Sequence, residues 1–192
     1  MITIVDYSAG NTQSVINALN RIGVECMVSN NAEVILKAEK VILPGVGEAS
    51  SAMSSLRNLN LEMLIPQLKQ PVLGICLGMQ LMCLHSEEND TDCLGIFDHK
   101  VLKFKTQNIV PHIGWNELTK VQNPLFDEKM NGSDVYFVHS YYVPIVSETC
   151  ATADYEGQFS AAIQKDNFHG VQFHPEKSGT LGSIILENFI NL

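Results

Sequence analysis

Apolar positions follow two different periods along the first half of the chain. Residues 2–6 form a short β-branched run that predicts a strand, and apolar residues from Val15 to Ile22 then recur at helical spacing behind the capping candidates Asn11 and Thr12. Three more runs predict strands, at residues 25–29, 40–43 and 71–75. Because strands alternate with helices, the pattern predicts a parallel sheet with helices on both faces.

Strand patterns crowd together in the middle of the chain, where the helical period fades. They fall at residues 100–105, 112–118, 134–139, 150–155 and 160–164. A further strand pattern at 168–173 precedes a last helix, with Leu181, Ile184, Ile185 and Phe189 expected on one face. The predicted fold class is α/β: a doubly wound, mostly parallel sheet flanked by helices, with a strand-rich, partly antiparallel middle section.

Composition limits the class of protein. The 192 residues, 45% hydrophobic and 17% charged, fit one globular domain over residues 1–192. The longest uncharged stretch, residues 71–84, is shorter than the roughly 20 residues of a membrane-spanning helix, and Asp6 interrupts the first apolar run too early for a signal peptide. Twelve basic against 21 acidic residues give a net charge of −9, which disfavours nucleic acid and anionic membranes as partners.

The cysteines are odd in number and irregularly spaced, which matches neither a disulfide framework nor a zinc motif. They are Cys26, Cys76, Cys83, Cys93 and Cys150. Such thiols are typical of a reduced, cytoplasmic protein, and buried packing is the usual role of a free cysteine. The sequence predicts no metal and no cofactor.

Cys76 stands where an apolar strand pattern meets a helical one, with Gly74 and Gly78 two positions to either side. A nucleophile in a tight strand-to-helix turn leaves no room for side chains at those two positions, which explains the glycines. A helix N-terminus also favours the thiolate form of a cysteine. Taken alone, the motif fits a nucleophile and a buried structural cysteine equally well.

His174 and Glu176 follow the last apolar strand pattern directly, with Pro175 fixing the turn between them. A cysteine hydrolase needs an imidazole to move a proton between thiol and leaving group, and a carboxylate to orient that imidazole. Active sites of wound sheets gather at the carboxyl ends of strands, where Cys76 and His174 both fall. The two motifs together predict a Cys76–His174–Glu176 triad, against the alternative of a surface histidine beside a solvated glutamate.

The same chemistry needs donors for an oxyanion. The backbone N–H of Leu77, at the start of the helix, is the first candidate. The glycine-containing turn at residues 43–47 is the second, although an ordinary strand-to-helix turn would use the same residues.

Several short motifs, together with the elbow around Cys76, resemble the class I, or triad, glutamine amidotransferases. They are Asp6-Tyr7 with Gly10-Asn11, Pro44-Gly45-Val46-Gly47, Pro111-His112-Ile113-Gly114-Trp115-Asn116, His139-Ser140-Tyr141 and His174-Pro175-Glu176-Lys177-Ser178. The resemblance extends from Ile2 to the last helix. Within the family, the details are most similar to glutaminase subunits that serve a synthase of histidine biosynthesis.

The resemblance implies hydrolysis of glutamine through a thioester on Cys76. It also implies a heterodimer in which ammonia passes to a separate (β/α)8-barrel cyclase that makes imidazole glycerol phosphate and the purine-pathway intermediate AICAR. Family positions carry over as substrate contacts onto Gly45, Gln80, Glu88, His139, Ser140 and Tyr141. They carry over onto Val46 as a second oxyanion donor beside Leu77, and onto Asn11, Trp115 and Lys177 as partner contacts.

Alternatives stay open at some of these positions. Glu88 also fits a solvated acidic run, and Gln80 a helix-surface amide. Tyr141 fits cross-strand packing as well as ligand contact, and Trp115 fits a core position on a strand. Val46 matches a family position whose backbone N–H is not always turned toward the oxyanion site when the partner subunit is absent. We therefore expect the isolated chain to be a poor glutaminase. The sequence departs from the family pattern at Ser8, where glycine is common, and at Cys83. If the helix continues, Cys83 lies two helical turns beyond Cys76 and packs behind the nucleophile.

Three other functions remain possible from the sequence. The first is a glutaminase for another ammonia-using synthase, and the second is a stand-alone γ-glutamyl hydrolase. The third is a non-catalytic redox or small-molecule-binding module. A sensor needs no oriented general base, so the His174–Glu176 pair argues against the third.

Overall fold

The computed structural model describes residues 1–105, 109–122 and 124–192. Its main sheet contains β1 Ile2–Val5, β2 Cys26–Ser29, β3 Lys40–Leu43, β4 Val72–Ile75, β11 Thr149–Asp154, β12 Gln158–Lys165 and β13 Phe168–Val171. The strand order is β11-β12-β13-β4-β3-β1-β2. The five strands from β13 to β2 run parallel, and β12 and β11 extend the sheet in antiparallel pairing. The predicted parallel sheet is confirmed.

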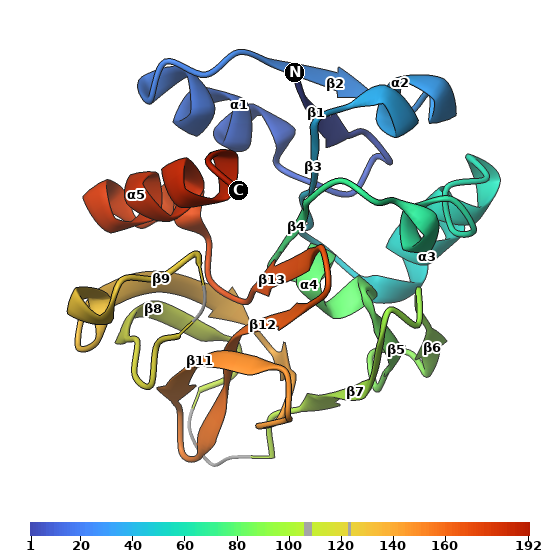
Figure 1. The fold of residues 1–192 in the computed structure, drawn as a ribbon. Coiled ribbons are helices and arrows are strands. Elements are labelled where there is room, and N and C mark those ends of the chain that lie inside the picture. The colour runs from blue at the N-terminus through green and yellow to red at the C-terminus, as the bar shows by residue number, and fades with distance from the viewer. Residues whose placement is uncertain (106–108, 123) are drawn as a thin grey trace.

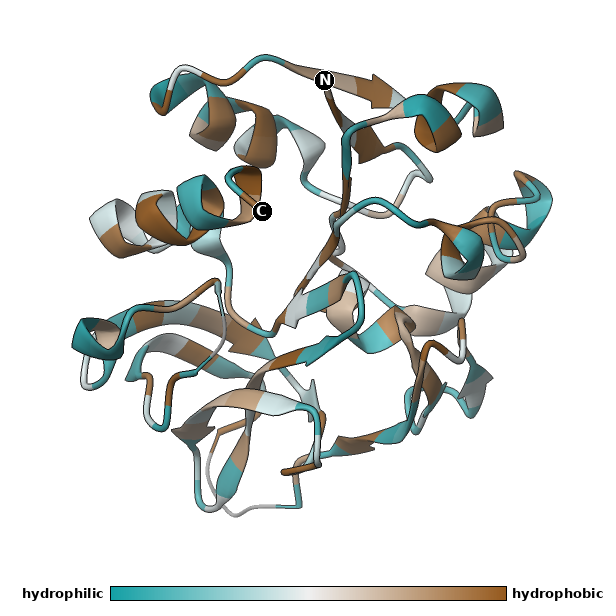
Figure 2. Ribbon diagram, in the orientation of Figure 1, coloured by the Kyte–Doolittle hydropathy of each residue, from teal (hydrophilic) through white to brown (hydrophobic). Residues whose placement is uncertain are grey.

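Helices cover both faces of this sheet (Figure 1). They are α1 Thr12–Arg21, α2 Ala32–Lys37, α3 Ala49–Asn58, α4 Leu77–Leu81 and α5 Gly179–Ile190, with the 3-10 turns η1 Ile65–Gln67, η2 Glu128–Met130 and η3 Pro175–Lys177. One hydrophobic core lies under α1 and α5, and a second lies under α2, α3 and α4. Strands β3 and β4, largely hydrophobic in the colours of Figure 2, run between the two layers, and their apolar residues are buried.

We call the described residues between 83 and 165 the strand-rich half of the molecule, and the other described residues the parallel half. Besides β11 and β12, the strand-rich half contains β5 Cys83–Ser86, β6 Thr91–Asp92, β7 Phe97–Lys103, β8 His112–Glu117, β9 Asp134–His139 and β10 Tyr141–Tyr142. One small sheet has the order β10-β7-β5-β6, and β8 pairs with β9. Only the β5–β7 pairing among these is parallel, which confirms a partly antiparallel middle section.

The structure corrects two expectations about helices. Cys83 does not lie on the helix behind the nucleophile, because α4 ends at Leu81 and Cys83 begins β5, where it is fully buried. In α5 the buried residues are Gly182, Ile185, Leu186 and Phe189. Ile184 is 38% exposed, because it points away from the sheet on which this helix packs.

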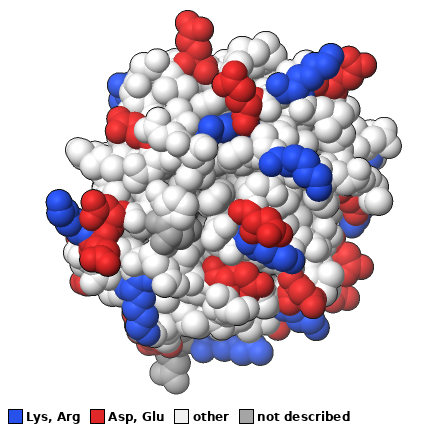
Figure 3. Space-filling view, viewed as in Figure 1, with Lys and Arg blue, Asp and Glu red and all other residues white. Residues whose placement is uncertain are grey.

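Charged groups of both signs are intermixed over the face shown in Figure 3, although the chain carries an acidic excess. In the described part of the chain, no helix combines the length and apolar character needed to cross a bilayer.

Candidate active site

Cys76 occupies a strained turn between β4 and α4. Its backbone angles are φ +51° and ψ −108°, in a region that residues other than glycine rarely adopt. A Cβ on Gly78 would lie 1.9 Å from the carbonyl oxygen of Leu43, and a Cβ on Gly74 would lie 2.8 Å from the backbone of Gly78. The close contacts therefore require both glycines, for the reason that the sequence suggested.

The turn that follows β3 packs against this elbow. A Cβ on Gly45 would lie 2.4 Å from a backbone nitrogen of the elbow, so only glycine permits the approach. The buried hydroxyl of Tyr7 donates a hydrogen bond to the carbonyl oxygen of Pro44, and burial raises the pKa of Tyr7, which keeps it a donor. The turn places Val46 and Gly47 at the pocket, whereas Gly45 serves the packing, and its substrate contact stays a prediction.

His174 and Glu176 form a buried pair. Nδ1 of His174 lies 2.7 Å from Oε1 of Glu176, and each side chain is 2% exposed. Since a carboxylate only accepts, Nδ1 carries the proton and Nε2 is left for the reaction; it has no hydrogen-bond partner among the described residues. Burial by itself would lower the pKa of His174, but the neighbouring Cys76 and Glu176 outweigh it and raise the pKa to about 10. The protonated imidazole is therefore favoured beside Cys76.

Two elements hold His174 in place. Its backbone N–H donates to the carbonyl of Tyr136 on β9 at 2.9 Å. The Ser178 hydroxyl donates to the carbonyl of His174 at 2.7 Å and accepts from the N–H of Tyr136 at 3.0 Å. On the other side, a Cβ on Gly182 would lie 1.9 Å from the carbonyl oxygen of Pro175, so α5 packs closely on η3. The position of Ser178 within the His174 motif was its only sequence signal.

The Cys76 sulfur has two further polar neighbours. The thiol donates to the carbonyl of Val138 at 3.7 Å, and Nε2 of Gln172 donates to the sulfur at 3.7 Å. Neither Val138 nor Gln172 was predicted as a site residue. Val138 directly precedes the predicted site residue His139, and Gln172 lies two residues before His174. This closeness in the sequence is the signal that could have found them.

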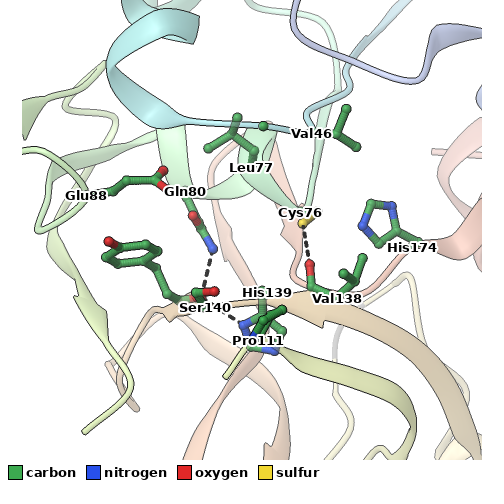
Figure 4. A pocket seen from close by; sticks show the side chains of 12 residues that line it. Val46, Cys76, Leu77, Gln80, Glu88, Pro111, Val138, His139, Ser140 and His174 are labelled. Atoms are coloured by element: carbon green, nitrogen blue, oxygen red, sulfur yellow. Dashed lines mark hydrogen bonds between the residues drawn. The ribbon is translucent and has the colours of Figure 1, made fainter. Parts of the chain in front are cut away.

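A pocket of about 260 Å³ opens in front of Cys76 (Figure 4). This is below the roughly 300–1,000 Å³ typical of drug-sized ligands, so the pocket suits a small metabolite such as an amino acid. The predicted residues that line it are Val46, Cys76, Leu77, Gln80, Glu88, His139, Ser140, Tyr141 and His174. Gly47, Pro111 and Val138 line it as well, and they were not predicted as site residues.

Glu88 lies at the end of the pocket opposite the nucleophile (Figure 4). Its Oε2 accepts a 2.7 Å hydrogen bond from the N–H of Ala49 at the start of α3, and burial raises the pKa of Glu88. The Gln80 amide nitrogen donates both of its hydrogens, one to the carbonyl of Tyr141 and one to Oε1 of Gln172, each at 2.9 Å. Both side chains therefore offer the pocket acceptors, which suit a ligand ammonium.

His139 lines the pocket, but both of its ring nitrogens already have partners. Nδ1 is 2.8 Å from the carbonyl of Tyr141, and Nε2 is 3.1 Å from Nδ1 of His112, whose Nε2 is 3.3 Å from the Asn116 amide nitrogen. Because a carbonyl only accepts, the donors run in order from Asn116 through both histidines to Tyr141. Burial lowers the pKa of His139 to about 3 and also lowers that of His112, so both rings are neutral. The ring of His139 therefore holds Tyr141 in place, and its contact with glutamine stays a prediction.

The three predicted partner contacts lie outside the pocket and are exposed. Trp115 is 57% exposed on β8, which excludes the core alternative. Its ring meets Tyr136 edge-on with the centroids 6.0 Å apart, and Nζ of Lys177 lies 5.8 Å from the centre of the Tyr136 ring. Asn11 caps α1 by accepting a 3.2 Å hydrogen bond from the N–H of Ser14. Trp115, Tyr136 and Lys177 thus form one surface patch.

Comparison with known proteins assigns the family. The model for glutamine amidotransferase class-I matches residues 3–192. This chain belongs to the class I glutamine amidotransferases. The imidazole glycerol phosphate synthase subunit HisH of Bacteroides thetaiotaomicron is 51% identical to this amidotransferase over 194 residues, covering 100% of the chain and 99% of the relative. HisH of Buchnera aphidicola is 46% identical with the same coverage, so the subgroup expected from the motifs is confirmed.

Solved structures share the fold of this amidotransferase. A glutamine amidotransferase matches with a TM-score of 0.78 at 16% identity, over 100% of this chain and 98% of that one. PurLQS from Thermotoga maritima matches with a TM-score of 0.74 at 17% identity, over 99% and 97% of the two chains. At such identities the likeness establishes the fold alone.

Proposed function

We propose that this amidotransferase hydrolyses glutamine to glutamate and ammonia through a thioester on Cys76, with His174 and Glu176 completing the triad. One observation carries the proposal: the strained Cys76 and the free Nε2 side of His174 share a small pocket, while buried Glu176 holds the other nitrogen of the ring. A structural cysteine would need neither the strain nor an oriented base.

In the first half-reaction, the Cys76 sulfur attacks the side-chain amide carbon of glutamine, and an S–C bond forms. The negative charge that develops on the amide oxygen is stabilised by the backbone N–H groups of Leu77 and Val46. Nε2 of His174 gives its proton to the amide nitrogen, the C–N bond breaks and ammonia leaves. A γ-glutamyl thioester and a neutral His174 remain.

In the second half-reaction, water attacks the thioester carbon. Neutral His174 takes a proton from this water at Nε2, and the same N–H donors stabilise the second oxyanion. The C–S bond then breaks, which releases glutamate and restores the thiolate beside a protonated imidazole. Glu176 keeps Nδ1 protonated throughout and so fixes which nitrogen carries out both transfers.

The polarity of the pocket orients the substrate. Acceptors of Glu88 and Gln80 lie toward one end, and the nucleophile lies at the other (Figure 4). The pKa of Tyr141 is raised by partial burial and by the nearby charges of Glu88, Glu87 and Glu48, an acidic surrounding that suits the α-ammonium of glutamine. The amide end then reaches Cys76.

We further propose that the ammonia passes to a (β/α)8-barrel cyclase in a heterodimer that makes imidazole glycerol phosphate and AICAR in histidine biosynthesis. Support comes from the relatives, which are named as subunits of imidazole glycerol phosphate synthase. The exposed Trp115–Tyr136–Lys177 patch, with Asn11, is the proposed contact surface. The family match over residues 3–192 supports one glutaminase domain, and five free cysteines support a reducing, cytoplasmic location.

The catalytic assignment is tested by glutamine turnover in the complex assembled with the cyclase. Cys76→Ala is expected to lower turnover about 10,000-fold, because it removes the nucleophile. Cys26→Ala, a partly buried cysteine on edge strand β2, is the matched control and should keep activity. Turnover by Cys76→Ala equal to that of the control would overturn the proposal.

The partner assignment is tested by comparing glutamine turnover with and without the cyclase and its nucleotide substrate. We expect the isolated chain to be much slower, and glutamine to support formation of the cyclase product. Equal turnover in both conditions would contradict partner dependence. Robust hydrolysis of γ-glutamyl peptides by the chain alone would favour the stand-alone hydrolase instead.

A further inference from the structure

Gln172 is a fully buried polar side chain beside the nucleophile. It follows β13 and precedes His174 by two residues, and its backbone N–H donates to the carbonyl of Ala161 at 2.8 Å. Its amide group reaches back to Cys76, with Nε2 at 3.7 Å from the sulfur. Sheet strand β13 thus delivers two side chains to the site, a base and an amide.

The orientation of the Gln172 amide follows from its neighbours. The carbonyl of Tyr141 can only accept, so the Gln80 atom 2.9 Å away must be the nitrogen. The same nitrogen lies 2.9 Å from the Gln172 amide, which must therefore present its oxygen there. The Gln172 nitrogen is then the atom that faces Cys76. Two linked amides and one carbonyl leave no alternative assignment with every bond made.

We infer that Gln172 is a catalytic residue that stabilises the Cys76 thiolate by donating an amide hydrogen to its sulfur. The inference rests on the proposed role of Cys76 as the nucleophile. It gives Gln172 a function distinct from substrate binding, because its amide contacts the sulfur and Gln80.

The two hydrogen bonds of the sulfur respond differently to ionisation. As a thiol, Cys76 donates to the Val138 carbonyl, and a thiolate has no hydrogen for that bond. The Gln172 N–H donates to either form, and a donor to an ionised acceptor is roughly twice as strong as a donor to a neutral one. Burial strengthens the difference, since bulk water does not screen it. Gln172 therefore favours the reactive form.

The magnitude supports a net gain in rate. Each tenfold rise in the thiolate fraction costs only about threefold in intrinsic nucleophilicity, because the Brønsted coefficient for thiols is about 0.4–0.5. A donor that stabilises the thiolate therefore raises the share of the thiolate–imidazolium pair, from which the first half-reaction starts, by more than it lowers the reactivity of that thiolate.

The test is the pH dependence of Cys76 alkylation by iodoacetamide, a neutral probe, in the full chain, with modification at Cys76 followed by peptide mass spectrometry. Gln172→Met keeps the approximate shape but removes both the donor to the sulfur and the acceptor for Gln80, and its midpoint pH should rise by about one unit. Gln172→Glu is nearly isosteric and places a carboxylate near the sulfur, so its midpoint should rise further. Gln164→Met, on the neighbouring strand β12 and bonded to the carbonyl of Asp166, is the control and should match the parent.

The outcomes separate this inference from the triad assignment. Unchanged midpoints in both Gln172 variants, with melting curves like that of the parent, would overturn the inference even if Cys76→Ala abolishes turnover. If Gln172→Met fails to fold, Gln172→Asn decides instead, because the shorter amide no longer reaches the sulfur and adds no charge. A rise in midpoint together with a lower kcat is the expected pattern, since a packing or substrate-binding role would not move the midpoint.

Discussion

The two walls of the pocket are held by different kinds of contact. The parallel half supplies Cys76 and His174 from the ends of β4 and β13, and backbone approaches that only glycine permits fix the elbow. The strand-rich half supplies Glu88 and the segment from Val138 to Tyr141, and a chain of side-chain hydrogen bonds fixes that segment.

The two kinds of contact suit two different functions, covalent catalysis and substrate binding. Covalent chemistry needs atoms placed to a fraction of an ångström, and a close-packed backbone turn provides that stiffness. Binding a small polar substrate tolerates adjustment, which side-chain hydrogen bonds allow. We therefore expect changes in the parallel half to lower kcat, and changes in the strand-rich half mainly to raise KM for glutamine.

Among the changes that test this comparison, the largest effect is expected from Glu176→Gln. The amide keeps the shape of the side chain, but it can present a donor to Nδ1 of His174 and stabilise the wrong tautomer, so kcat should fall about 1,000-fold or more. Steady-state glutamine hydrolysis in the cyclase complex measures this. Glu187→Gln, on the exposed side of α5, is the control. A fall of less than tenfold would show that the carboxylate does not orient the base.

Gly78→Ala tests the elbow itself. The new Cβ would meet the Leu43 carbonyl oxygen at 1.9 Å, so the turn must shift; we expect turnover to fall about 100-fold and the free energy of unfolding to drop by about 3 kcal/mol. In Gly10→Ala the new Cβ would meet the Pro44 side chain at 3.1 Å and its backbone only at 3.6 Å, so the losses in the free energy of unfolding and in turnover should be far smaller. Similar losses in both variants would remove the distinction between backbone and side-chain contacts.

Buried histidines make stability depend on pH in both halves. Burial lowers the pKa of His139 to about 3 in the strand-rich half and that of His169 to about 4 in the parallel half. Their unfolded value is about 6.5, so between about pH 4 and 6.5 the unfolded chain binds more protons. The free energy of unfolding should therefore fall as pH falls through this window, by about 1.4 kcal/mol per pH unit for each histidine.

His169→Leu measures one of these contributions separately. Nδ1 of His169 has no hydrogen-bond partner in the described structure. Replacing this histidine should therefore make the free energy of unfolding depend less steeply on pH, without loss of stability at pH 7. Urea unfolding between pH 4.5 and 7 gives both quantities. A slope equal to that of the parent would mean that His169 titrates normally in the folded chain.

The smallest effect is expected from His112→Phe in the strand-rich half. Phenylalanine keeps the stacking on Tyr155, where the ring centroids are 4.1 Å apart, but removes the donor to Nε2 of His139. One neutral hydrogen bond is worth about 1 kcal/mol, so KM for glutamine should rise about fivefold with kcat little changed. A larger loss in kcat than in KM would break the proposed division between the walls.

Local patterns predicted the parallel half well. Strands β1 to β4 follow their apolar runs, and α1 begins at Thr12 behind Asn11. Ser8, where the family often has glycine, has a φ of +64°, a conformation that glycine adopts more readily. Helices α2 and α3 were missed, because α2 has only six residues and α3 is rich in serine, so each gives a weak helical period.

Pairings between distant segments were harder to predict. The expected helix through Cys83 is a strand, because its partner is β7, fourteen or more residues further on. His139 matched a substrate position, yet its ring nitrogens pair with Tyr141 and with His112, 27 residues away. No spacing rule in the sequence indicates such a contact.

The sequence alone determined the wound sheet, the elbow at Cys76 and the His174–Glu176 pair, because periodicity and steric demands for glycine act over a few residues. Only the tertiary structure decided which polar side chains face the ligand and which face one another. The residue types of Gln172 and His139 do not reveal their roles. Those roles follow from the hydrogen-bond partners that folding brings to them. Hydrogen bonds between segments 27 to 96 residues apart are set by the packing of whole sheets and helices.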